Sequence, residues 1–349
     1  MSYSPASTLR ERTFDRLKKS IAGERADGHA VFHYYTFPFY HYVSGVPLQQ
    51  YLHDPKTMFD VQLGVLERLE KCGSFQPDPG PVAECSSLGG KVRFDKEGFI
   101  SAAPSGIECI EDIVGLEPGD PYGDNYMHLA LRTLEYMLDH APKDIKVNPP
   151  ISVAPFTVAA QLRGISDFCA DTLEDPDFVR ALLEITTETC IRFIRACEKV
   201  MGGPIHHVLM SDDLSSFLSA PIFQDLVMPC YAKIFEQFPQ TEFWLHNDAQ
   251  AKHLCKLIAD SGFKAWQYAP SVDSLEAMEA AGGRISLFGG LSPLKFQHTS
   301  AQETYDICIE KLKSFGGNNK FVLGVGGSVN QIPLENLMAM FHAADDYKI

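Results

Sequence analysis

The sequence predicts an α/β fold, a (β/α)8 TIM barrel with an N-terminal extension and an insertion in its first half. From residue 150 onward, short apolar runs rich in β-branched and aromatic residues alternate with longer amphipathic stretches, the pattern of repeated βα units. Six such units in succession favour a closed barrel over an open sheet. The length of 349 residues fits one barrel with insertions, because single α/β barrels often exceed ~250 residues. We therefore expect residues 1–349 to form a single barrel domain.

The second half of the chain contains the six expected strands, each a short apolar run. They cover residues 151–155, 206–211, 241–246, 265–269, 285–288 and 321–325. Helices are expected at residues 176–200, 221–237, 249–260, 272–281, 301–314 and 334–343. This alternation of strands and helices predicts a parallel sheet covered by helices.

The first half of the chain is less regular. Residues 30–35 predict a first strand and residues 56–71 a helix, but no segment stands out as the second strand. Residues 73–125 carry many glycines and prolines, which indicates an insertion of short strands and turns near residues 91–102. We expect this insertion to cover one end of the barrel.

Composition and charge limit the classes of partner. The formal net charge of −15 disfavours nucleic acid and anionic membranes, which both attract clusters of Lys and Arg. No apolar stretch reaches the roughly 20 residues that span a bilayer, and the start of the chain lacks the apolar core of a secretion signal. Nine scattered cysteines without a C-x-x-C pair indicate reduced thiols. A cytoplasmic protein with a small-molecule substrate or a protein partner is expected.

Polar residues and glycines fall at the carboxyl ends of the predicted strands. In a (β/α)8 barrel these ends form one rim around a shared cavity, where the active site lies. The rim residues are Ser211-Asp212-Asp213, His246-Asn247-Asp248, Gln267-Tyr268, Gly289-Gly290 and Gly326-Gly327-Ser328. The sequence therefore predicts a polar site at this rim.

The acidic residues and the histidine of the rim have two interpretations each. Asp248 either caps the helix that follows it or belongs to the site, and Asp212 and Asp213 pose the same choice. His246 is either a structural hydrogen-bonding residue or a catalytic one. Adjacent carboxylates at a strand end can hold a cation, orient a polar substrate or share a proton. We expect at least one of Asp212 and Asp213 to face the cavity.

The glycines and aromatic residues are ambiguous in the same way. Gly289 and Gly326 fit either tight turns or a close approach of a flat ligand to the backbone. The run of residues 33–42 is unusually aromatic, and core packing accounts for most such residues. The remaining aromatic residues could line a pocket for an aromatic ring or a tetrapyrrole.

Several motifs resemble those of the uroporphyrinogen decarboxylase superfamily, which also contains methylcobalamin:coenzyme M methyltransferases and corrinoid-dependent demethylases. The resemblance extends from about residue 28 to the end of the chain. The matching segments are TLEDPDFVRALLEITTE (172–188), HHVLMSDDLSS (206–216), SAPIFQDLVMPCYAKIFE (219–236), LHND (245–248), LFGGLSP (287–293) and FVLGVGGSVNQIPLENLMAM (321–340).

Departures from the family's motifs narrow the expected reaction. The decarboxylases carry an arginine-rich N-terminal segment that binds the substrate's carboxylates, whereas this chain has HYYTFPFYHY there. The thiol methyltransferases hold zinc through a His-x-Cys pair and a later Cys. Here the histidine is His246, but Asp248 replaces the first cysteine and Gly326 the second. A zinc site of the His/Cys/Cys type is therefore not expected, while zinc on His246 and Asp248 remains an alternative.

The resemblance implies transfer of a methyl group from a small methylated donor to a corrinoid (cobalamin) carried by a partner protein. A methoxylated aromatic donor is preferred, which makes the chain an O-demethylase. The expected catalytic residues are His246, Asp248 and Asp213. The expected substrate-binding residues are Asp212, Asn247, Tyr34, Tyr35, Phe37, Tyr268, Gly289 and Gly326. Two alternatives are a decarboxylase-like lyase acting on another acidic substrate and a non-catalytic barrel that binds a corrinoid or tetrapyrrole.

Overall fold

A computed structural model of the chain describes residues 7–349, so predictions for residues 1–6 lie outside the described part. Its central feature is a six-stranded parallel sheet whose strands pair in sequence order. The strands are β3 (Ser152–Val153), β4 (His207–Ser211), β5 (Glu242–Asn247), β6 (Ala265–Tyr268), β7 (Ser286–Leu291) and β8 (Phe321–Val325). All six strands predicted for the second half of the chain are confirmed.

Two short extended segments occupy the remaining positions of the barrel. Val31 and Tyr34 form parallel bridges to Leu323 and Ser328, beside β8. At the other side, Phe75 forms a parallel bridge to Val147, just before β3. The expected strand at residues 30–35 is therefore present as isolated bridges, and the second strand lies near Phe75, within the stretch of glycines and prolines that obscured it in the sequence.

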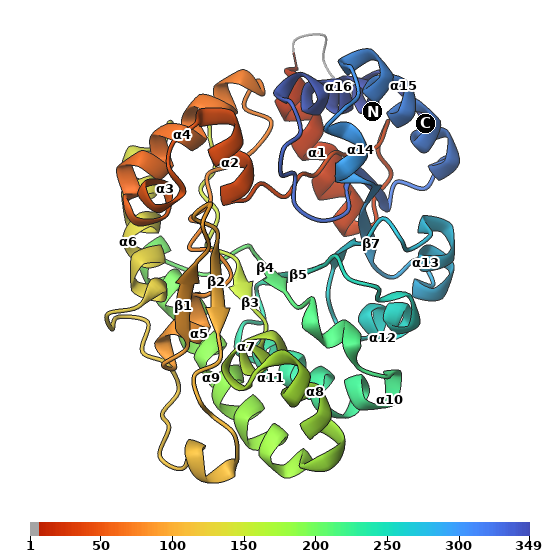
Figure 1. Cartoon of the computed structure of the whole chain (residues 1–349). Helices are drawn as coiled ribbons and strands as arrows, with labels where there is room; N and C mark the ends of the chain where they lie inside the picture. The colour runs from red at the N-terminus through yellow and green to blue at the C-terminus, as the bar shows by residue number, and fades with distance from the viewer. Residues whose placement is uncertain (1–6) are drawn as a thin grey trace.

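Helices surround the strands, as Figure 1 shows. They are α1 (Leu9–Ala22), α2 (Phe37–Ser44), α3 (Leu48–His53), α4 (Pro55–Arg68), α5 (Ala83–Ser87), α6 (Tyr126–His140), α7 (Pro155–Arg163), α8 (Ile165–Glu174), α9 (Pro176–Met201), α10 (Ala220–Ile222), α11 (Met228–Gln237), α12 (Cys255–Asp260), α13 (Ser274–Ala281), α14 (Pro293–Phe296), α15 (Ala301–Phe315) and α16 (Leu334–Asp346). Between residues 7 and 349, none of the helices is both long and apolar enough to cross a membrane.

The helix boundaries follow local sequence signals where these are strong. α9 begins where the Asp175 side chain accepts a hydrogen bond from the Phe178 amide, and it ends at Gly202 in the left-handed conformation. The helix expected from residue 249 begins later, with a 3-10 turn at Lys252–Leu254. The expected helix 221–237 contains a π-helical turn at Phe223–Val227.

Residues 73–125 contain an antiparallel hairpin of two short strands. β1 (Lys91–Phe94) pairs with β2 (Ile100–Ala103), with Lys91 opposite Ala103. A short 3-10 helix follows at Ile110–Ile113. In Figure 1 this orange hairpin lies between α3 and β3, beside the strands of the barrel.

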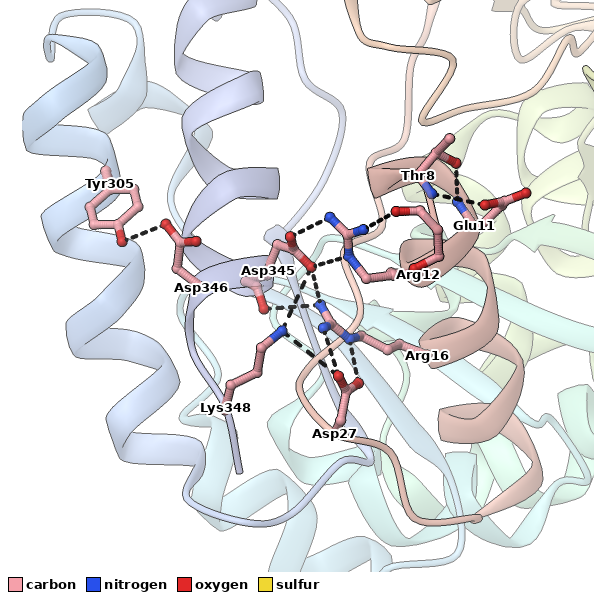
Figure 2. Close-up of polar contacts among 11 residues, drawn as sticks. Thr8, Glu11, Arg12, Arg16, Asp27, Tyr305, Asp345, Asp346 and Lys348 are labelled. Carbon is pink, nitrogen blue, oxygen red and sulfur yellow. Dashed lines mark hydrogen bonds and ion pairs between the residues drawn. The ribbon is translucent and has the colours of Figure 1, made fainter. Parts of the chain in front are cut away.

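α1 is fixed to the C-terminal helix α16 by a group of ion pairs, shown in Figure 2. The buried Arg16 guanidinium binds Asp27 at 2.9 Å and Asp345 at 3.1 Å. Arg12 binds the same Asp345 carboxylate at 2.6 Å. Although burial acts in the opposite direction, the Arg16 guanidinium lowers the pKa of Asp27, and the arginines likewise lower the pKa of Asp345. α1 is therefore held across the amino-terminal ends of the strands.

The interior of the barrel is packed with side chains. Leu209, Trp244, Phe288 and Val322 project inward from four strands and form one apolar cluster with Ile21 of α1. The outer face of the sheet packs against the surrounding helices in a second, larger apolar cluster. The carboxyl ends of the strands, rather than the middle of the barrel, are therefore where polar side chains can meet a ligand.

Candidate active site

His246 lies at the end of β5, between Ser211 of β4 and Gln267 of β6. The residue is 5% exposed, and its Nδ1 lies 2.8 Å from Gln267 Oε1. Gln267 Nε2 donates to the carbonyl oxygens of Val325 and Gly327, at 3.0 and 2.8 Å. Because these bonds orient the amide, Oε1 can only accept, so Nδ1 of His246 carries the hydrogen. The Nε2 atom is left available for a proton or a cation.

Asp213 and Asp248 complete a three-residue group around that nitrogen. His246 Nε2 lies 3.8 Å from Asp213 Oδ1, and one ligand atom of each of the three residues lies within 4.8 Å of the others. The Asp248 amide donates to Asp213 Oδ1 at 2.9 Å, which ties the ends of β4 and β5 together. Neither aspartate caps a helix through its side chain, since Ala251 precedes the next helical turn and Asp213 makes no capping bond. The helix-capping alternative is therefore wrong for both.

The electrostatics of this group favour a bound proton or cation. Burial raises the pKa of Asp248, the neighbouring Asp213 carboxylate raises it further, and His246 acts in the opposite direction. Gly327 makes the close packing feasible, because a Cβ there would lie 2.8 Å from Asp248 Oδ2. Two carboxylates beside one imidazole hold negative charge that a positive group at Nε2 would balance.

Tyr34 forms an aromatic wall of the site. Its ring lies 4.6 Å from the His246 ring in an edge-to-face arrangement. Burial raises the pKa of the Tyr34 hydroxyl well above its ordinary value, and the charges of Asp78, Asp213 and Asp248 raise it further. Tyr34 therefore stays a neutral phenol at physiological pH. This state is compatible with the predicted contact between Tyr34 and a substrate.

Asp78 belongs to the same region but was missed in the sequence. Its side chain accepts a hydrogen bond from the Gly80 amide at 3.1 Å, while its buried Oδ2 atom has no hydrogen-bond partner among residues 7–349. Burial raises the pKa of this carboxyl to about 6. Its charge also raises the pKa of the Tyr34 hydroxyl, after the larger effect of burial. The only sequence signal was an acidic residue within a segment of prolines and glycines, which reads as a turn.

Asp212 and Asn247 are buried, and their side chains are hydrogen-bonded within the protein. Asp212 is 0% exposed, and its two carboxylate oxygens accept hydrogen bonds from the hydroxyls of Thr157 and Tyr231. The Asn247 amide donates to the Asp212 carbonyl at 2.7 Å. Of the adjacent aspartates, Asp213 faces the site and Asp212 fastens it to the neighbouring helices. Substrate contact by Asp212 or Asn247 stays a prediction without geometric support.

Three of the predicted aromatic contacts are directed elsewhere. Tyr268 lies on the outer face of β6, where its hydroxyl bonds Ser274 at the start of α13. Tyr35 packs on Phe39, and Phe37 packs on Phe99 beside the β1–β2 hairpin. The alternation of a strand explains this result, because Gln267 and Tyr34 point inward and their neighbours point outward.

Gly289 and Gly326 permit a close approach of neighbouring backbones. A Cβ at Gly326 would lie 2.3 Å from the Tyr268 carbonyl oxygen, and one at Gly289 would lie 3.1 Å from the Gly326 Cα atom. Gly289 also has a φ of 114°, which other residues rarely adopt. Packing of the strand ends therefore accounts for both glycines, and a ligand contact at either stays a prediction.

The donor set of the group fits a divalent cation. Ligands of a tetrahedral zinc ion, with bonds of about 2.0–2.1 Å, lie roughly 3.4 Å apart, and the 3.8 Å separation of His246 Nε2 from Asp213 Oδ1 is close to this value. The bond from His246 Nδ1 to Gln267 is the kind of contact that orients a metal-binding imidazole. One nitrogen and two carboxylate oxygens suit zinc or a harder divalent ion.

The fold and this site define an α/β barrel with a polar group of one histidine and several carboxylates at the carboxyl ends of its strands. Residues 14–347 match the sequence profile of the uroporphyrinogen decarboxylase (URO-D) family. The chain therefore belongs to this family, as its motifs predicted.

Similar proteins include two methyltransferases from Methanosarcina mazei. The chain is 24% identical over 205 residues to the methylated-thiol–coenzyme M methyltransferase of strain Goe1, a match that covers 57% of this chain and 53% of that protein. The chain thus spans about half the length of this curated relative. A solved structure of a methyltransferase from the same species superposes with a TM-score of 0.80 at 20% identity, covering 97% of this chain and 98% of that one.

A more distant likeness is to a B12-independent methionine synthase from Shewanella sp. W3-18-1, with a TM-score of 0.52 at 10% identity. It covers 84% of this chain and 87% of that one. At these identities the solved structures establish the barrel fold and not the reaction.

Proposed function

We propose that this protein transfers a methyl group from a small methylated donor to the cobalt of a corrinoid carried by a partner protein. The observation that carries the proposal is the group of His246, Asp213 and Asp248 beside Tyr34 at the rim of the barrel. Membership of the URO-D family and the methyltransferase names of its similar proteins support methyl transfer as the reaction.

The proposed chemistry needs little covalent participation from the protein. Cobalt(I) attacks the methyl carbon, the bond from carbon to the donor heteroatom breaks, and its electron pair stays on the leaving atom. The protein must align the donor with the cobalt and stabilise the leaving anion. A proton on His246 Nε2 would neutralise a leaving phenolate, and the carboxylates of Asp213 and Asp248 lie beside that nitrogen. Asp213 and Asp248 thereby act through His246.

A divalent cation is the alternative positive group at the same position. The residues that would hold it are His246, Asp213 and Asp248. When bound, the cation would supply electrostatic stabilisation of the leaving oxygen or nitrogen. The proton and the cation cannot occupy Nε2 together, so metal analysis of the purified protein distinguishes them.

We further propose a methoxylated aromatic compound as the donor. The neutral Tyr34 ring offers an edge or face for an aromatic donor, and the oxygen-rich group beside it suits a phenolate leaving group rather than a thiolate. The site lacks the two cysteines that the thiol methyltransferases use, because Asp248 and Gly326 stand in their places. These two features favour an oxygen donor over a sulfur donor.

The test is a visible-absorbance assay with reduced cobalamin or a corrinoid protein, to which methoxylated aromatics, methylamines and betaines are added in turn. Loss of the Co(I) band together with growth of the methyl-Co(III) band is expected with a methoxylated aromatic. The same change with a methylamine instead would support methyl transfer but contradict the proposal of a methoxylated aromatic donor.

Two other outcomes would refute methyl transfer itself. Tight corrinoid binding without reaction of any donor would favour a binding barrel. Absence of both binding and reaction would favour decarboxylation of another acidic substrate, which an assay for released CO2 would then address.

A further inference from the structure

A cavity lies toward the opposite end of the barrel, between α1 and the amino-terminal ends of the strands. Its volume is about 450 Å³, within the range of small-molecule sites. Residues of α1 form one wall, and the beginnings of β4 and β5 form another. Tyr34 is the residue that this cavity shares with the site around His246.

The walls of this cavity are largely aromatic. Phe14 of α1, Phe32 and Trp244 line it together with Phe341 of α16. The Trp244 ring is held by an almost parallel stack on His207, with centroids 4.2 Å apart. Planar walls of this kind suit a flat ligand of one or two rings.

Positive charge gathers at the exposed edge of the cavity, although the chain as a whole has a net charge of −15. Lys18 and Lys146 line it, and both side chains are exposed. Two carboxylates also line it, but Asp15 is paired with Lys19 at 2.6 Å, which leaves Glu242 as the other. The two lysines outnumber this remaining carboxylate, so the edge favours an anion.

Buried polar atoms near the cavity have no partner within the described part of the chain. Trp244 is 6% exposed and its indole N–H makes no hydrogen bond. His33 is 7% exposed and both of its ring nitrogens lack a partner. Unpaired polar groups inside a protein cost free energy, which a ligand oxygen would recover. Water molecules held beside these atoms, together with a ligand, would satisfy them, so the cavity is polar in part rather than an empty apolar space.

The cavity is also preformed, because the ion pairs of Arg12 and Arg16 fix α1 to α16. A rigid wall lowers the conformational cost of binding. We propose that this cavity binds a small aromatic carboxylate, with its ring between Phe14 and Trp244 and its carboxylate near Lys18 and Lys146. This site shares Tyr34 with the proposed methyl-transfer site, but His246, Asp213 and Asp248 do not line it, and the proposal does not depend on that function.

The tryptophans provide a direct reporter of binding. The chain has two, of which Trp244 lines the cavity and Trp266 lies on the outer face of β6. In a Trp266→Phe variant, titration with 4-ethylbenzoate should change the fluorescence of Trp244 in a saturable manner. If that variant folds poorly, titration calorimetry on the unmodified protein measures the affinity instead.

Matched probes and variants test the charge and the location. The neutral 4-ethylbenzamide and the Lys18→Met/Lys146→Met variant should each weaken binding by about tenfold or more, whereas Lys56→Met on the exposed face of α4 should not. His246→Ala should leave the affinity unchanged. Absence of saturable binding, equal affinity for the amide, or loss of binding in His246→Ala would each overturn the proposal.

Discussion

At the end of the barrel covered by α1, Asp27 and Asp345 lie against arginine side chains, and their pKa values are lowered. At the opposite rim, Asp213 and Asp248 lie beside one histidine, and neither of them pairs with a lysine or arginine in the described residues. Burial raises the pKa of Asp248 instead. Charge is neutralised where it holds the fold together and left unbalanced where chemistry is proposed, a contrast typical of functional sites.

The largest effect is expected from removing the unbalanced charge at the rim. The Asp213→Asn/Asp248→Asn variant should lower the rate of methyl transfer by about 100-fold or more, because an amide cannot hold an imidazolium or a cation. Stopped-flow absorbance of the cobalt product measures this rate. The matched control is Asp124→Asn/Asp139→Asn, in which both residues are exposed. Equal rates in the two variants would contradict a role of the unpaired carboxylates of Asp213 and Asp248 in methyl transfer.

A smaller effect is expected from Gln267, which positions His246 without contacting the donor. Gln267→Leu should lower turnover by roughly 10- to 100-fold, as for other groups that orient a reactive imidazole. Gln267→Glu keeps the oxygen that accepts the Nδ1 hydrogen and should retain more activity, with a shifted pH profile. A purely structural role predicts equal losses in the two variants and an unchanged profile.

At the α1 end, the expected effect is on stability and not on turnover. Arg16→Met removes a buried guanidinium that binds Asp27 and Asp345. The free energy of unfolding should fall by roughly 2–3 kcal/mol, less than for a fully buried pair, because the aspartates are 26% and 17% exposed. Urea denaturation measures this change. A full loss of methyl transfer in folded Arg16→Met protein would contradict a purely stabilising role for the ion pairs of α1.

A second effect on stability concerns Glu84, a buried carboxyl outside the site. Ser152 and Val153 donate to its Oε1 atom, while Oε2 has no partner. Burial raises the pKa of Glu84 from 4.5 to about 7, so the folded state binds this proton more tightly than the unfolded chain. Its contribution to stability is complete below about pH 4.5 and is lost as the pH rises through about 7.

The Glu84→Gln variant removes this titration. Its free energy of unfolding should therefore decline less than that of the unmodified protein between pH 4.5 and 7, by roughly 2–3 kcal/mol. Denaturation at several pH values measures the difference. If the free energy of unfolding depends on pH equally in the two proteins, Glu84 does not have the raised pKa on which this prediction rests.

The sequence predicted the regular half of the barrel well because strands β3–β8 are short apolar runs with clear neighbours. It predicted the first half poorly for a physical reason. Phe75 contributes a single bridge within a segment of glycines and prolines, and α1 is held by ion pairs between residues more than 300 positions apart. Neither local composition nor periodicity records such long-range contacts.

The site was predicted in part for a similar reason. Proximity to the strand ends selected His246, Asp213 and Asp248, which the structure brings together. Tyr268 was selected and Gln267 was not, although the two-residue period of a strand directs only one of them inward. Asp78 lies in a separate loop, and its influence on Tyr34 results from the three-dimensional path of the chain.

The most direct test of the account is the single-turnover rate of methyl transfer in His246→Ala, compared with His140→Ala on the exposed end of α6. We predict that His246→Ala folds normally and binds the corrinoid but forms methyl-Co(III) at least about 100-fold more slowly, while His140→Ala matches the unmodified protein. An unchanged rate in His246→Ala would contradict the account and remove this histidine, and the carboxylates around it, from the mechanism.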